Sequence, residues 1–207
     1  MLPSLAFIAA AILLAIVPGP GMAYVVARTV AGGRAEGVAS SLGTAAGGMV
    51  HVVAAALGLS VLIAESAVAY SLAKYLGAAY LLYLGVRTLM KKAPAADVPT
   101  LRRAGAGKAF RDGVVVEALN VKTAMFFLAF IPQFVSHAHP FALQFVVLGT
   151  LCVAFNTTAD LIVVAAAHRF VVSGAARAAR EKVLTKISGA TMAALGLFVA
   201  FSSREGT

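Results

Sequence analysis

Val17-Pro18-Gly19-Pro20-Gly21-Met22 interrupts an apolar segment that runs from residue 2 to residue 31 and contains one charged side chain. An unbroken helix of that length would measure about 45 Å, which exceeds the roughly 30 Å hydrocarbon core of a bilayer. Proline lacks a backbone N–H and clashes with the preceding turn, and glycine tolerates unusual dihedral angles. Proline also suits the first turn of a new helix. The stretch therefore predicts two half-helices that meet at a break inside the membrane.

Composition narrows the class of protein. Of the 207 residues, 61% are hydrophobic and only 12% are charged, whereas about a quarter of the residues in a soluble domain are charged. We therefore expect a polytopic membrane protein with one domain. The net charge of +9 is typical of a membrane protein whose basic loops set its topology. We therefore expect the protein to lie in a lipid bilayer and not to bind nucleic acid. No Lys or Arg precedes the first apolar region, which we interpret as a retained helix and not a signal peptide.

Six apolar segments are predicted to span the membrane. They lie at about 2–31, 41–64, 67–90, 113–135, 141–167 and 187–203. Lys and Arg gather in the first, third and fifth connecting loops, and the second and fourth contain none. Because positive charge marks the cytoplasmic side, we expect the basic loops in the cytoplasm and both termini on the outer side of the membrane.

The two halves of the chain show a similar pattern. An offset of about 102 residues sets Ala118–Met125 beside Ile16–Ala23, and in each half a polar or helix-breaking run precedes an apolar stretch. A Pro- and Gly-containing cytoplasmic linker, 91–110, separates repeat one (1–90) from repeat two (111–207). Because each half has three spans, an odd number, the two halves are expected to cross the membrane in opposite directions. The sequence thus predicts an all-α polytopic fold of six transmembrane helices, an inverted 3+3 repeat with a broken first helix.

Ionisable side chains inside a membrane cost about 2.5–3.5 kcal/mol each, so they point to function. Glu117, Asn120 and Lys122 fall within six residues near the cytoplasmic end of the fourth segment. Glu117 and Asn120 share a helix face if the helix is regular there. Lys122 either pairs with Glu117 or Asp160, or stays charged to receive a carboxylate. A simple Glu117–Lys122 ion pair near the headgroups is the structural alternative.

Two further titratable groups are candidates for proton coupling. Asp160 lies well inside the fifth segment, shortly after Asn156, Thr157 and Thr158. A carboxyl kept protonated there can release its proton when water enters. His51 titrates in the range that a proton site needs, and it is equally well explained as a core residue.

Other polar and small residues are interpreted as structural. Arg28 and Lys74 are expected to extend to the membrane interface. Gly43 and Gly47 permit a close helix contact, either within the chain or between two copies of it, so a homodimer is one assembly we consider. No set of metal-ligating residues has a suitable spacing, and we predict neither a metal nor a cofactor.

Three stretches resemble the LysE/RhtB family of amino-acid exporters. Pro18-Gly19-Pro20-Gly21 resembles the family's Pro-Gly-Pro signature, and Lys74–Gly85 is similar to its third-span pattern. Asn120-Val121-Lys122, followed by Phe126–Phe134, resembles its Asn-Pro-Lys segment and the run after it. The likeness covers nearly the whole chain. Val121 stands where the family has proline, so we expect a softer second break and a more continuous fourth span.

The resemblance implies export of amino acids or close derivatives from the bacterial cytoplasm, driven by the proton gradient. Helix N-termini at the first break suit a substrate carboxylate. The predicted substrate-binding residues are Pro18, Gly19, Pro20, Gly21, Asn120, Lys122 and Asp160, and the predicted proton-coupling residues are Asp160, Glu117 and His51. Efflux of another small metabolite and a channel-like pore are the alternatives. An enzyme is not expected, because no nucleophile–base pair stands out.

Overall fold

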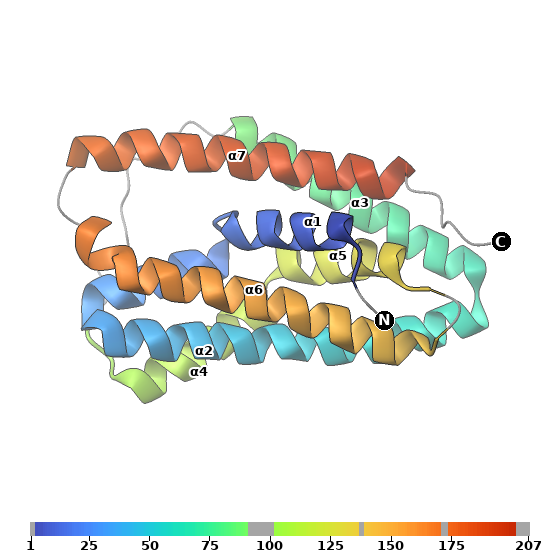
Figure 1. The fold of residues 1–207 in the computed structure, drawn as a ribbon, viewed down its shortest axis with the longest axis horizontal. Coiled ribbons are helices and arrows are strands. Elements are labelled where there is room, and N and C mark those ends of the chain that lie inside the picture. Colours follow the sequence, from blue (N-terminus) through green and yellow to red (C-terminus); the bar gives the residue numbers. More distant parts are fainter. Residues whose placement is uncertain (1–2, 91–101, 137–138, 171–173, 202–207) are drawn as a thin grey trace.

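The computed structural model describes residues 3–90, 102–136, 139–170 and 174–201. Within these ranges the chain is helical and contains no strand (Figure 1), so the predicted all-α fold is confirmed there. The elements are α1 (Leu5–Ile16), α2 (Pro20–Glu65), α3 (Ala67–Met90), α4 (Ala106–Ala118), α5 (Val121–Ala129), the short 3₁₀ helix η1 (Ile131–Phe134), α6 (Phe141–Phe170) and α7 (Gly174–Phe201). A turn at Gly33 divides α2, and its φ of 76° is a conformation that favours glycine.

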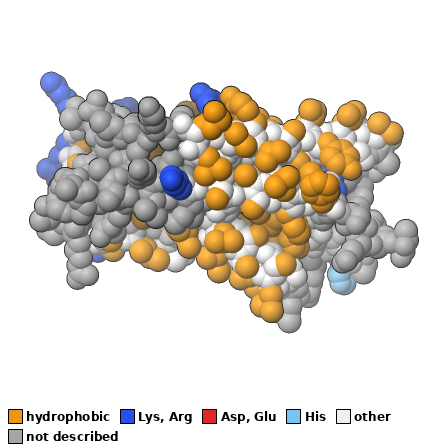
Figure 2. Space-filling view, turned by 90° about the horizontal axis from the view of Figure 1, so that it is seen from above, with side chains coloured by type: hydrophobic (Ala, Val, Ile, Leu, Met, Phe, Trp, Pro, Cys, Tyr) orange, Lys and Arg blue, Asp and Glu red, His pale blue; other side chains and the backbone are white. Residues whose placement is uncertain are grey.

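Several of these helices suit a membrane. Pro20–Leu59 and Phe141–Ala166 are long and apolar enough to cross one, and α4 with Val121–Phe134 forms a third, bent candidate. Figure 2 shows hydrophobic side chains over the middle and right of the view. Most of the visible Lys and Arg side chains lie toward the left end. Leu5 and Met90 are 85% and 77% exposed, which is costly in water and favourable against lipid. These features agree with a polytopic membrane protein, and the number of six spans stays a prediction.

The short helices α1 and α5 lie in the centre of the bundle. They are flanked by α3 and α7 on one side and by α2, α4 and α6 on the other (Figure 1). Phe7 of α1 stacks on Phe130 with 6.3 Å between ring centroids and meets the edge of Phe134 at 5.4 Å. This aromatic packing joins the first turn of α1 to the residues that follow α5.

The helix ends alternate between the two ends of the molecule. The Gly33 turn, the start of α4, the end of α6 and the start of α7 lie at one end (Figure 1). The junction of α2 with α3 and the start of α6 lie at the other end. This is the alternation that the predicted loops require, and the side that faces the cytoplasm stays a prediction. Residues 91–101 of the predicted linker lie outside the described residues. The helix α4 already begins at Ala106, within the range predicted for the linker, and the division into two repeats stays a prediction.

A buried ion pair ties α2 to the start of α4. Arg28 Nη1 lies 3.2 Å from Glu36 Oε2, and Glu36 Oε1 accepts the backbone N–H groups of Ala104 and Gly105 at 2.8 Å each. Arg28 is only 5% exposed, so the expectation that it extends to the membrane interface is wrong. Its charge is satisfied inside the protein and does not need to reach water. Lys74 is also buried, with its ammonium 5.6 Å from the ring centre of Tyr75, so the same expectation fails there.

Gly43 and Gly47 lie where α2 crosses α4. A Cβ added to Gly43 would collide with the carbonyl oxygen of Phe110, and one added to Gly47 would meet that of Val114. The two backbones therefore touch directly, as small residues allow. The contact lies within one chain, which settles the choice left open by the sequence and removes this glycine pair as an argument for a homodimer.

We expect Gly43→Ala to destabilise the protein, because α2 and α4 must separate to admit the methyl group. The loss should be about 1–3 kcal/mol, as for other overpacked sites, and it is measured as a lower thermal midpoint in detergent. Gly58→Ala is the matched control in the same helix, because a Cβ there meets nothing within 4 Å. Equal midpoints for the two variants would contradict the direct backbone contact.

Candidate functional site

The first helix break lies between α1 and α2. Val17 ends α1 in an extended conformation, with φ −71° and ψ 111°. Pro20 begins α2, and the first backbone bond of the new helix runs from the Ala23 N–H to the Gly19 carbonyl at 2.9 Å. The predicted pair of half-helices is confirmed. The break leaves the carbonyl group of Val17 and the first amides of α2 without partners in their own helices.

The second break lies at Leu119 and Asn120, where α4 and the helix after it meet at 50°. Asn120 caps α5, because its Oδ1 accepts the Lys122 N–H at 3.1 Å. The expectation of a more continuous fourth span, based on Val121 in place of proline, is therefore wrong. A capping side chain provides the helix start that proline would otherwise favour.

Glu117 stabilises this second break through both of its oxygens. Oε2 accepts Asn120 Nδ2 at 3.1 Å, and Oε1 accepts the Thr123 hydroxyl at 2.6 Å. The contact with Asn120 therefore forms although the helix is not regular there. His51 Nε2 lies 2.8 Å from the backbone carbonyl oxygen of Glu117. Among the described residues no ion pair joins Glu117 to Lys122, so the simple structural alternative is wrong.

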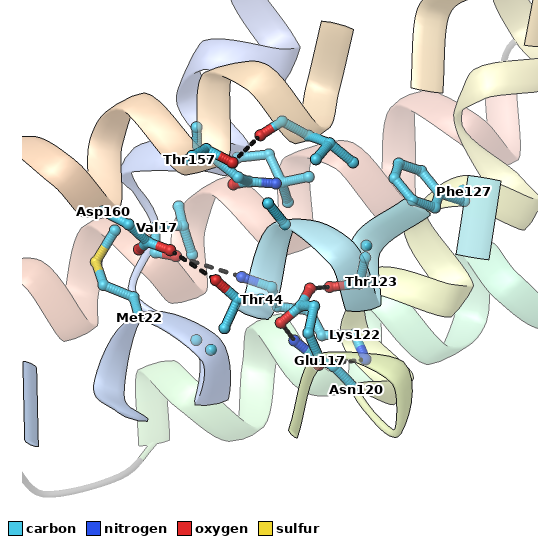
Figure 3. A pocket seen from close by; sticks show the side chains of 18 residues that line it. Val17, Met22, Thr44, Glu117, Asn120, Lys122, Thr123, Phe127, Thr157 and Asp160 are labelled. Atoms are coloured by element: carbon cyan, nitrogen blue, oxygen red, sulfur yellow. Dashed lines mark hydrogen bonds between the residues drawn. The ribbon is translucent and has the colours of Figure 1, made fainter. Parts of the chain in front are cut away.

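Lys122 connects the two breaks. Its side chain extends from α5, and Nζ donates to the carbonyl oxygen of Val17 at 3.3 Å (Figure 3). Gly19 leaves room for this ammonium, because an added Cβ would lie 2.7 Å from Nζ. The cation thus satisfies the free carbonyl at the end of α1.

Asp160 of α6 faces this region from the opposite wall (Figure 3). It is 6% exposed, and its Oδ2 lies 3.2 Å from the hydroxyl of Thr44 on α2. The same hydroxyl lies 2.8 Å from the carbonyl oxygen of Ser41. A hydroxyl has one proton, so Thr44 donates either to Ser41 or to Asp160. When it donates to Ser41, the contact with Asp160 requires a protonated carboxyl as the donor.

The two breaks and α6 enclose a cavity of about 40 Å³. Its polar wall comprises Thr44, Glu117, Asn120, Lys122, Thr123, Asn156, Thr157 and Asp160. Leu14, Met22, Phe127 and Val153 contribute apolar surface. This volume holds a few water molecules and is too small for an amino acid. A substrate of that class needs more room than the cavity has in this structure.

The structure gathers most of the predicted site residues at this cavity. Gly19, Gly21, Asn120, Lys122, Glu117 and Asp160 line it. Pro18 and Pro20 belong to the first break and do not line the cavity. His51 does not line it either, and contacts the backbone carbonyl oxygen of Glu117. The roles predicted for all of these residues stay predictions.

Sequence reasoning missed two residues of the cavity wall and gave two others no role. Thr44 and Thr123 were not recognised, and Asn156 and Thr157 were noted only as neighbours of Asp160. Thr44 lies between Gly43 and Gly47, so its place at a close helix contact was available as a signal. No pattern in the sequence pairs Thr123 with Glu117, because that contact depends on the bend at Asn120.

Comparisons with known proteins agree with this picture. Residues 12–203 match the family model of the LysE type translocators. A homoserine/homoserine lactone efflux protein of Salmonella typhimurium is 30% identical over 152 residues, which are 73% of this chain and 73% of the relative. A Vibrio cholerae relative described as an uncharacterized membrane protein is also 30% identical over 152 residues, 73% of this chain and 74% of its own length. No solved structure matches the chain.

Asn120→Ala should weaken the second break, because it removes both the cap of α5 and a donor to Glu117. We expect a loss of about 1–2 kcal/mol, the usual cost of removing a cap, seen as a lower thermal midpoint in detergent. Asn120→Ser keeps a capping oxygen and should recover part of the loss. If Asn120→Ala were as stable as the wild type, the cap would not hold the break.

Proposed function

The chain belongs to the LysE type translocator family, and from this premise we propose that it exports amino acids or close derivatives from the bacterial cytoplasm across the inner membrane, in exchange for protons. Membership of a transporter family argues against an enzyme. Homoserine is the first substrate to test, because a relative is named a homoserine/homoserine lactone efflux protein. The observation that carries the proposal is one small cavity lined by a lysine, an aspartate and two helix breaks.

These groups complement an amino-acid zwitterion. Lys122 Nζ is bonded to a neutral carbonyl, so a substrate carboxylate is a stronger partner for it. The first amides of α2, at Gly21 and Met22, lie at the positive end of a helix and add to the attraction. Among the described residues, Asp160 has one hydrogen-bond partner, Thr44, which leaves acceptor positions for a substrate ammonium. In this proposal the carboxylate binds at the break and the ammonium binds at α6.

Asp160 also provides a simple basis for proton coupling. One carboxyl binds either a proton or an ammonium group strongly, because protonation removes the charge that attracts the ammonium. Exchange of a substrate for a proton at this carboxyl gives antiport. The Thr44 hydroxyl fits both forms, because it can donate to the carboxylate or accept from the protonated acid. Glu117 and His51 are the alternative proton carriers.

We further propose that the two halves form an inverted 3+3 repeat of six spans. Adding the offset of 102 to the bounds of α1, 5 and 16, gives 107–118, against the observed Ala106–Ala118 of α4. The same offset carries the first break, residues 17–19, to residues 119–121, against the observed break at Leu119 and Asn120. Helices in corresponding positions also pack together, α2 on α6 and α3 on α7. Rocking of one half against the other then opens the cavity to each side in turn, with the basic loops in the cytoplasm and both termini outside.

In proteoliposomes we expect homoserine efflux to be driven by a pH gradient and to fall at least tenfold in Asp160→Asn. The amide cannot carry a proton or attract an ammonium group, so both roles of this position are lost. Radiolabelled homoserine provides the measurement. Asp112→Asn is the matched control, because Asp112 pairs with Lys108 on the partly exposed surface of α4 and should leave transport unchanged.

Two results would overturn parts of this proposal. Gradient-driven efflux that survives Asp160→Asn would move proton coupling to Glu117 or His51 and keep the exporter. If the wild type moved no amino acid under any gradient, the substrate class itself would be wrong.

A further inference from the structure

Among the described residues, one polar side chain of the cavity wall lacks a hydrogen-bond partner. Thr44, Glu117, Asn120, Lys122, Thr123, Thr157 and Asp160 each make a hydrogen bond to another described residue. Asn156 makes none within the described part of the chain, although it lines the cavity and is partly buried. A primary amide has two donors and one acceptor oxygen, so this side chain has its full bonding capacity available to the cavity.

The position of Asn156 relates it to the proposed ammonium site. It lies four residues before Asp160 in α6, so the two side chains share a helix face about 6 Å apart along the axis. Val153, three residues before Asn156 in α6, adds apolar surface to the same wall. A substrate held by its ammonium group at Asp160 therefore has its own side chain within reach of the Asn156 amide.

An unpaired amide also discriminates between ligands. In the absence of substrate, water can satisfy it, since the cavity has room for a few molecules. A substrate that displaces the water with a methyl group leaves the amide unpaired, whereas one that brings a hydroxyl or carbonyl oxygen replaces the lost bonds. Sites built around a polar partner reject the apolar analogue for this reason.

We propose that Asn156 is a specificity-determining residue that binds the polar group of the substrate side chain. The preferred substrates are then small amino acids with a hydroxyl or carbonyl oxygen in a short side chain, over apolar amino acids of equal size. The inference rests on the proposed function, because it takes an amino acid in this cavity as given. It adds the substrate class within that function and the residue that selects it.

Asn156→Leu tests the inference with isosteric substrates. Threonine and valine differ by a hydroxyl in place of a methyl group, and so do homoserine and norvaline. In proteoliposomes we expect the wild type to transport the hydroxylated member of each pair with the higher kcat/KM. In Asn156→Leu this preference should fall by about tenfold, as the loss of one hydrogen bond predicts.

Thr158→Val is the matched control in the same helix. Thr158 is exposed, bonds the Ala154 carbonyl and does not line the cavity, so its replacement should leave both ratios unchanged. Asn156→Ala provides a second variant without added bulk. If both Asn156 variants are inactive in transport, the preference is measured as the ratio of binding affinities within each pair. These affinities are obtained from the thermal stabilisation of the detergent-solubilised protein by each amino acid.

The outcomes separate this inference from the proposed function. A purely structural role for Asn156 would lower the rates for both members of a pair and leave their ratio unchanged, which would overturn the specificity role while the exporter stands. A wild type that transports no amino acid would overturn the proposed function, and this inference with it.

Discussion

The structure depends on one constraint, that backbone exposed by a helix break inside a membrane has to be satisfied by the protein. This chain has two such breaks, and polar groups at the second break form hydrogen bonds at both. Lys122 lies just after the second break, and its ammonium donates to the carbonyl oxygen of Val17 at the first break. Asn120 caps α5 at the second break and donates to Glu117, which packs against Gly21. The contacts of this polar cluster thus satisfy the broken backbone, whatever the cluster binds.

The main break and the candidate acids could be predicted from the sequence because their signals are local. Pro18 and Gly19 disrupt a helix wherever they occur, and Asp160 stands out against its apolar neighbours. The second break was underestimated, because the capping bond of Asn120 starts α5 without a proline and leaves a weaker sequence pattern. The burial of Arg28 was missed for a related reason. Its partners are Glu36 and the backbone carbonyl oxygen of Arg102, and the carbonyl lies before α4 and reaches Arg28 only through the tertiary fold.

The composition of α2 follows from its two neighbours. On one side it contacts α4 so closely that Gly43 and Gly47 have no room for a side chain. On the other it contacts α6, where Thr44 meets Asp160. A helix that has to pack its backbone against one neighbour and present a hydroxyl to another cannot be uniformly large and apolar. The small and hydroxylated residues in the middle of α2 therefore reflect packing and chemistry together, which is why sequence alone did not separate them.

The small cavity connects the proposed binding to movement. In this state Lys122 bonds the first break and Thr44 bonds α6, and both contacts hold the surrounding helices together. A zwitterion that takes Lys122 with its carboxylate and Asp160 with its ammonium competes with those same contacts. In the proposed function, loading exchanges bonds within the protein for bonds to the substrate, and it shifts the arrangement of the helices by the difference in affinity between the two states. The groups proposed to recognise the substrate are then also those that hold the helices around the cavity together without it.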